Sequence, residues 1–233
     1  MQRLKNQGAQ IILALDVDTF AEAKYFVDKL YPKIKIFKVG SHLFTAYGPK
    51  IIELVHKKGG EVFLDLKYFD IPNTVAGAVA AAVKLKVKML TLHIGGGKKM
   101  ILAAVAAARD QAKTSGLKRP RLIGVTVLTS QKASPREVLR LAQQGIGNGL
   151  DGVVCSVHEA ALICKKIKKN FIVVTPGIRM NNSACDDQKR TATVSEAQKA
   201  GSNFLVIGRP ILKADNPIKK TEELLGDLYG RGN

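Results

Sequence analysis

Three charged side chains stand close together in the stretch FLDLKYFDIPNTV, residues 63–75. Asp65 and Lys67 fall at the end of an apolar run, and Asp70 follows three residues later. Burying a charge is unfavourable unless it is paired or used in chemistry. Side chains two apart on a strand share a face, so Asp65 and Lys67 are expected to point into one space. The acid would stay ionised there and the lysine protonated, which suits a proton donor and argues against a Schiff base, since that needs a neutral amine.

Other polar side chains follow other apolar runs at the same relative position. These are Asp16, Lys38, His93, Thr129, Ser130, Ser156, Gly208 and Arg209. If the runs are parallel strands, their carboxyl ends meet on one face, which in a β/α barrel carries the chemistry. Four charged groups on the first three runs favour a binding or catalytic site over a structural ion pair.

Two later segments have features of phosphate binding. In NFLVIGRPI, residues 203–211, Gly208 lets the backbone approach a ligand closely and Arg209 offers a bidentate cation. The segment TPGIRMNNSACDDQKR, residues 175–190, is long and polar, as binding loops often are. Its candidate ligand contacts are Arg179 and Gln188.

The elements that must position these residues alternate between strand and helix. Eight short apolar runs predict buried parallel strands at 11–17, 35–40, 61–67, 87–94, 121–130, 151–156, 171–177 and 203–208. Helices are predicted at 19–31, 72–86, 97–112, 134–144, 157–169, 193–200 and after Pro217. This alternation predicts a single-domain (β/α)8 TIM barrel of the α/β class over residues 1–233. A doubly wound open sheet is the main alternative, but no GxGxxG turn follows the first run.

Composition limits the classes of partner. The formal charge is +18, from 37 Lys and Arg against 19 Asp and Glu, which favours anionic partners. The lysines are scattered rather than gathered in an aromatic-interleaved stripe, so we expect a basic surface without specific nucleic-acid binding, although a basic nucleic-acid-binding protein is an alternative. No apolar run approaches the roughly 18–20 residues that span a bilayer, and no signal peptide is evident. We expect a cytoplasmic protein with no membrane contact.

No cofactor signature is present in the sequence. The three cysteines form no CxxC pair and match no zinc spacing, so we interpret them as reduced structural thiols. Zinc, flavin, nicotinamide and pyridoxal motifs are also missing. If the protein is an enzyme, we expect its own side chains to act without a metal or a cofactor.

The motifs together resemble the orotidine 5′-phosphate decarboxylase family, from the first predicted strand to the last. The resemblance is carried by LALD (13–16), FKVG (37–40), FLDLKYFDIPNTV (63–75), VTVLTS (125–130), DGVVCSVHEA (151–160), VTPGIR (174–179), DQKR (187–190) and VIGRPI (206–211). It implies a (β/α)8 homodimer that converts orotidine 5′-phosphate to UMP and carbon dioxide, the last step of de novo pyrimidine nucleotide biosynthesis, without cofactor or metal. One departure is a connection between Ser130 and Gly149 that is shorter than is common in the bacterial enzymes, although no family ligand lies there.

The resemblance also implies roles for single residues. Asp16 and Lys38 match contacts to the ribose hydroxyls, and Asp65 matches the carboxylate placed against the substrate carboxylate. Lys67 matches the proton donor to C6, where the charge left by carbon dioxide has no adjacent carbonyl to delocalise it. A fixed ammonium would stabilise that charge and then supply the proton.

The remaining roles concern the partner subunit, the pyrimidine and the phosphate. Residues that resemble those entering the neighbouring subunit's site are Asp70, Ile71 and Thr74. Thr129 matches a position beside the pyrimidine. The phosphate-binding set would be Arg179, Gln188, Gly208 and Arg209.

A sugar-phosphate decarboxylase or aldolase of the same superfamily is the closest alternative. Those enzymes share the DxKxxD stretch, but they use a magnesium ion and tend to carry an acid at the position of Lys38. A lysine there would repel a metal, so the sequence favours the metal-free reaction.

Overall fold

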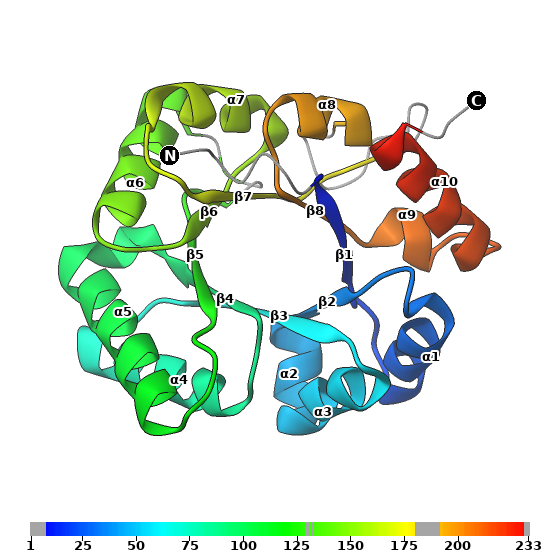
Figure 1. Ribbon diagram of the computed structural model, residues 1–233, viewed down its shortest axis with the longest axis horizontal. Coiled ribbons are helices and arrows are strands. Elements are labelled where there is room, and N and C mark those ends of the chain that lie inside the picture. Colours follow the sequence, from blue (N-terminus) through cyan, green and yellow to red (C-terminus); the bar gives the residue numbers. More distant parts are fainter. Residues whose placement is uncertain (1–7, 129–130, 132, 180–191, 231–233) are drawn as a thin grey trace.

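Eight parallel strands close into a barrel in the computed structural model, which describes residues 8–128, 131, 133–179 and 192–230 (Figure 1). The strands are β1 (Gln10–Ala14), β2 (Ile36–Gly40), β3 (Glu61–Tyr68), β4 (Met89–His93), β5 (Arg121–Val125), β6 (Gly152–Val154), β7 (Ile172–Thr175) and β8 (Phe204–Ile207). Pairing of β1 with β8, with Gln10 opposite Phe204, closes the ring. The predicted (β/α)8 barrel is therefore confirmed, and the open-sheet alternative is wrong.

Helices form the outer layer of the barrel (Figure 1). They are α1 (Phe20–Leu30), α2 (Ser41–Tyr47), α3 (Pro49–Lys58), α4 (Pro72–Lys84), α5 (Gly97–Thr114), α6 (Pro135–Gly147), α7 (Val157–Lys166), α8 (Val194–Lys199), α9 (Arg209–Leu212) and α10 (Pro217–Tyr229), with a 3₁₀ turn η1 (Ile94–Gly96) before α5. A capping box begins α1, because the Glu22 amide donates to the Thr19 hydroxyl at 3.1 Å and the Thr19 amide donates to the Glu22 carboxylate at 2.9 Å. Among the described helices, none is both long and apolar enough to cross a membrane.

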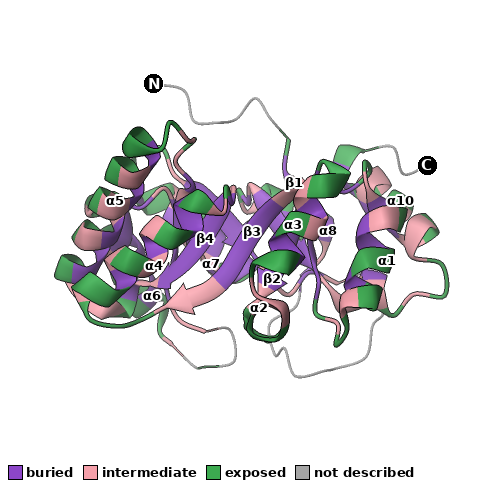
Figure 2. Ribbon diagram, turned by 90° about the horizontal axis from the view of Figure 1, so that it is seen from below, coloured by how far each residue is buried: buried purple, intermediate pink, exposed green. Residues whose placement is uncertain are grey.

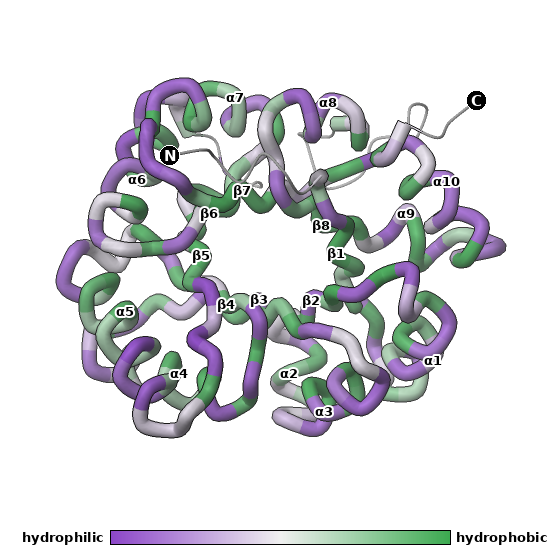
Figure 3. Tube along the Cα trace, viewed as in Figure 1, coloured by the Kyte–Doolittle hydropathy of each residue, from purple (hydrophilic) through white to green (hydrophobic). Residues whose placement is uncertain are grey.

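The strands are apolar on both faces because both faces are buried. Inside the barrel, a compact cluster is built around Ile12, Ile36, Phe63, Met89 and Phe204. The opposite strand face packs against the helices in a larger cluster. Figure 3 shows this as a mostly hydrophobic inner ring surrounded by helices of mixed hydropathy. Figure 2 shows β3 buried along most of its length and less buried at its arrowhead, where the carboxyl end opens.

Several element boundaries differ from the predictions. β1 ends at Ala14 and β5 at Val125, earlier than expected, because parallel pairing stops there: Ala14 faces Lys38 and Val125 faces Val154. Two helices, α2 and α3, fill the interval between β2 and β3, for which no helix limits were predicted. The short connection after Ser130 is occupied mostly by α6, whose Val138 is buried. That residues 1–233 form one domain stays a prediction, because both ends lie outside the described part.

Candidate active site

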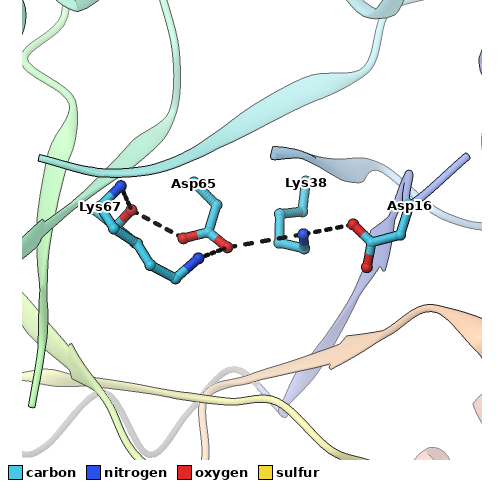
Figure 4. A network of polar contacts seen from close by, with 5 residues as sticks. Asp16, Lys38, Asp65 and Lys67 are labelled. Atoms are coloured by element: carbon cyan, nitrogen blue, oxygen red, sulfur yellow. Dashed lines mark hydrogen bonds and ion pairs between the residues drawn. The ribbon is translucent and has the colours of Figure 1, made fainter. Parts of the chain in front are cut away.

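Four side chains of alternating charge form a chain at the carboxyl end of the barrel (Figure 4). The Lys38 ammonium lies 2.9 Å from an Asp16 carboxylate oxygen and 3.7 Å from Asp65 Oδ2. The Lys67 ammonium donates to the same Asp65 oxygen at 2.9 Å. Asp65 and Lys38 have side chains only 12% exposed, whereas that of Asp16 is 58% exposed. Two cations therefore converge on one buried carboxylate.

Three neighbouring strands bring these groups together. Asp16 follows the last residue of β1 by two positions, and Asp65 lies on β3 opposite Gly40 of β2. Lys38 was expected at the end of its strand, but it is the third of five residues in β2. It still belongs to the site because its long side chain spans the distance from mid-strand to the two carboxylates, while its ammonium is satisfied by both of them.

The end of β3 is not a regular strand. Between Leu64 and Tyr68 the strand advances four residues while β4 advances two, from Leu90 to Leu92. Lys67 lies in this irregularity with φ of 51°, a left-handed conformation that costs a non-glycine residue about 1 kcal/mol. The prediction that Asp65 and Lys67 share one space is right, but simple strand alternation is not the reason. A bulge re-aims the Lys67 side chain.

Thr91 of β4 holds the bulge, and the sequence reasoning missed it. The Thr91 hydroxyl accepts a hydrogen bond from the Lys67 backbone amide at 2.9 Å and donates one to Asp65 Oδ1 at 2.9 Å. Thr91 is fully buried, so its hydroxyl needs such partners. The available signal was a polar residue in the middle of the apolar run VKMLTLHI, residues 87–94.

The network keeps Asp65 ionised. Burial alone would raise the pKa of this carboxyl, but Lys38 and Lys67, together with the hydrogen bonds from Lys67 and Thr91, outweigh it and hold the pKa below its usual value. A carboxylate with fixed cationic neighbours is thus maintained in a site mostly removed from water. Its lowered pKa also implies that its ionisation stabilises the fold above about pH 4, and that this contribution is lost as the pH falls through the folded pKa.

We expect Thr91→Val to raise the pKa of Asp65, because valine keeps the shape but removes one donor to the carboxylate. The loss of stability, about 1–3 kcal/mol for the unpaired buried groups, should be largest near pH 7. It should shrink as the pH falls through the folded pKa of Asp65, below about 4, where the carboxylate becomes neutral in both proteins. Carbon-detected NMR titration and urea unfolding at several pH values measure the two effects. Thr91→Ser is the matched control, and if it behaves like Thr91→Val, the hydroxyl is not what holds Asp65.

A cavity of about 250 Å³ lies over this network and has two kinds of wall. One wall is apolar and is formed by Val125, Val127, Leu128, Val154, Val174 and Pro176. Another part of the lining carries Arg179, Gly208 and Arg209. Gly208 packs closely against β1, since a Cβ there would lie 3.3 Å from the Ala14 Cβ, a tight contact. The cavity can therefore hold a flat apolar ring against its apolar residues and an anion against its two arginines.

Three further predicted residues do not line this cavity. Asp70, Ile71 and Thr74 are exposed, and a carboxylate oxygen of Asp70 accepts from the Ile71 amide at 2.6 Å. The prediction that Asp70 points away from its own barrel agrees with this exposure. Thr129 and Gln188 lie outside the described residues.

His93 borders the site without joining the chain of charges. Its ring lies 5.5 Å from the ring of Phe69, and burial, reinforced by Lys67 and opposed by Asp65, lowers its pKa. The sequence placed His93 among the polar residues at the strand ends, and it is packed there, but it forms no hydrogen bond through its ring with a described residue. The described residues contain no group of three or more His, Cys, Asp or Glu side chains arranged to hold a metal ion.

Comparisons of the sequence and of the structure with known proteins give the same family. The sequence model of the family described as "Orotidine 5'-phosphate decarboxylase / HUMPS family" matches residues 9–224. The orotidine 5′-phosphate decarboxylase of Vibrio cholerae is 45% identical over 230 residues, covering 94% of this chain and 98% of the relative. That of Coxiella burnetii is 42% identical, covering 98% and 100%. The crystal structure of the Lactobacillus acidophilus enzyme of that name superposes with a TM-score of 0.83 at 33% identity, covering 94% and 99%.

Proposed function

The chain belongs to the orotidine 5′-phosphate decarboxylase / HUMPS family, and we propose that it converts orotidine 5′-phosphate to UMP with its own side chains alone. It is a decarboxylase of pyrimidine nucleotide biosynthesis. The observation that carries the proposed mechanism is the alternation of charge from Asp16 through Lys38 and Asp65 to Lys67, with the two inner groups largely buried.

The reacting bond joins C6 of the pyrimidine to its carboxylate. In the proposed step this bond breaks, carbon dioxide leaves, and the electron pair stays on C6. The Lys67 ammonium, held by Asp65, faces the developing charge and then transfers a proton to C6. Because its position is fixed before the reaction begins, little reorganisation is needed as the charge develops. Asp65, kept ionised, opposes the substrate carboxylate and so favours its departure.

Binding of the distant phosphate supplies the energy that holds the substrate in this unfavourable setting. The proposed phosphate-binding set is Arg179, Gln188, Gly208 and Arg209. Arg179, Gly208 and Arg209 line the same cavity as the charged chain, which supports their assignment. Asp16 and Lys38 are proposed to hold the ribose hydroxyls between the phosphate and the pyrimidine.

Arg209→Ala should weaken UMP binding by about 10- to 100-fold, because a charge-assisted contact to phosphate contributes about 1.5–3 kcal/mol. Binding of uridine, which lacks the phosphate, should change less than about twofold. Isothermal titration of both ligands against both proteins measures the difference. Equal losses for UMP and uridine would place Arg209 away from the phosphate.

The magnesium-dependent sugar-phosphate enzymes of the superfamily are the alternative function. The Lys38 ammonium lies between the carboxylates of Asp16 and Asp65, the two oxygen donors that a divalent ion at this position would need. We therefore expect ultraviolet-monitored loss of orotidine 5′-phosphate at the same rate with and without EDTA. A rate that disappears in EDTA and returns with Mg²⁺ would contradict the proposed mechanism.

A homodimer with shared sites is part of the proposal. Phe69 and Ile71, which flank Asp70, are 65% and 66% exposed, unusually open for large apolar side chains. A second copy covering them would bring Asp70, Ile71 and Thr74 to its own cavity. This apolar surface supports the arrangement implied by the resemblance.

A further inference from the structure

A second cavity lies at the opposite end of the barrel from the charged chain. Its volume is about 570 Å³, within the range of small-molecule sites. It is formed by the turns that precede β3, β4 and β5, three adjacent strands (Figure 1). Its lining consists of His56, Gly59, Gly60, Glu61, Lys86, Val87, Lys88, Leu117, Lys118, Arg119 and Arg121.

Five cations and one carboxylate line this cavity, and two of the cations are already paired. Lys88 forms an ion pair with Glu61. Arg119 donates to both oxygens of Asp151, at 2.5 Å and 3.0 Å. These two ion pairs connect neighbouring turns, and stabilisation of the fold is enough to explain them. They do not explain the rest of the positive charge.

The other three cations, Lys86, Lys118 and Arg121, have no ion pair recorded with any described residue. Arg121 also lines a small adjoining hollow at the amino end of the strands, together with Lys88. Lys86 affects a titratable group that lines the cavity. Burial lowers the pKa of His56, and the charge of Lys86 lowers it further, whereas Glu61 raises it. The cavity therefore holds uncompensated positive charge.

The backbone conformation at Lys86 is also unusual. Lys86 has φ of 57° and lies two residues after the end of α4. Glycine is the usual residue for this left-handed conformation at a helix end. A lysine there is locally strained, although its amide closes the helix end by donating to the Val83 carbonyl at 2.9 Å. Its ammonium is exposed and forms no ion pair with a described residue, so it is available to a ligand.

We propose that this cavity binds a linear polyphosphate group, either inorganic or carried by a nucleoside. A single phosphate monoester carries about −1.5 to −2 charges at neutral pH, less than the three unpaired cations. Nucleic acid is disfavoured, because the cations line a hollow rather than a stripe and the lining contains no Phe, Tyr or Trp on which bases could stack. The site would also account for part of the +18 charge that decarboxylation does not require.

The test uses the full chain with saturating UMP, which occupies the phosphate-binding end of the active site. Tripolyphosphate and ATP are titrated at 0.15 M salt by calorimetry. Lys86→Gly/Lys118→Gln should weaken tripolyphosphate binding about tenfold or more. The matched control, Lys168→Gln/Lys169→Gln, removes the same charge from two exposed lysines in the turn before β7 and should change the affinity less than about twofold. Lys86→Gly alone should raise the melting temperature while it weakens binding, a combination that a structural lysine would not produce.

Two further readouts locate the ligand and its source. Tripolyphosphate should raise the pKa of His56 measured by NMR, and should leave the ring resonances of His158 in place. Equal affinity for tripolyphosphate and ATP supports recognition of the polyphosphate alone, and tighter ATP binding supports a nucleoside-borne group. The proposal is overturned if neither ligand binds, if both double variants lose affinity equally, or if an RNA oligonucleotide binds and tripolyphosphate fails to displace it.

Discussion

Lys67→Ala will lower kcat by at least about 10⁴-fold, which corresponds to about 5 kcal/mol in activation free energy. In the proposed mechanism, the Lys67 ammonium acts on charge that develops only in the transition state, and it also delivers the proton to C6. Removing it should therefore leave ground-state binding largely intact. Binding of UMP, which has no carboxylate at C6, should change by less than about tenfold. Single-turnover kinetics and calorimetry with UMP measure the two quantities.

Two companion variants make this experiment interpretable. Lys168→Ala, which removes an exposed lysine far along the chain, should keep full activity. Lys67→Gly should be as inactive as Lys67→Ala but more stable by about 1 kcal/mol, because φ of 51° suits glycine better than alanine. An alanine variant with unchanged kcat and a large increase in KM would show that Lys67 binds substrate instead of protonating it.

Mixing two inactive proteins, Lys67→Ala and Asp70→Ala, will restore activity to about a quarter of the wild-type value. Asp70 is exposed and follows the end of β3, and the proposed dimer lets it complete the partner's site. In a mixed dimer, the Asp70→Ala subunit keeps its Lys67 and receives an intact Asp70 from the other chain. The second site lacks both groups. With random exchange, about half of the dimers are mixed and half of their sites work.

The control for this experiment is the exchange itself, followed by native mass spectrometry of subunits that differ in isotope content. Lys67→Ala mixed with Lys67→Gly provides the negative control, since no arrangement of those subunits contains an intact lysine. If exchange is complete and no activity returns, Asp70 acts within its own subunit. The shared-site arrangement would then be wrong, while the role of Lys67 would be unaffected.

The sequence by itself determined the barrel and the end at which its chemistry lies. Buried parallel strands must be apolar on both faces, so a charged residue near the end of such a run, such as Asp16 or Asp65, is conspicuous. The eight strands and most of the helices between them could also be predicted, because hydrophobic periodicity is a local property of the chain. Strand ends were less predictable, since they depend on where the neighbouring strand stops pairing, as at Val125.

Only the tertiary structure decided how Lys67 reaches Asp65. The bulge in β3 and the left-handed Lys67 depend on a hydrogen bond from its amide to Thr91, a residue of the next strand that lies 24 positions away. Nothing local in FLDLKYFDIPNTV specifies that partner. The same holds for the second cavity, whose unpaired cations come from two turns that are separate in sequence. Pairing of β4 with β5 brings those turns together, and the field that they create depends on distances in space rather than on spacing along the chain.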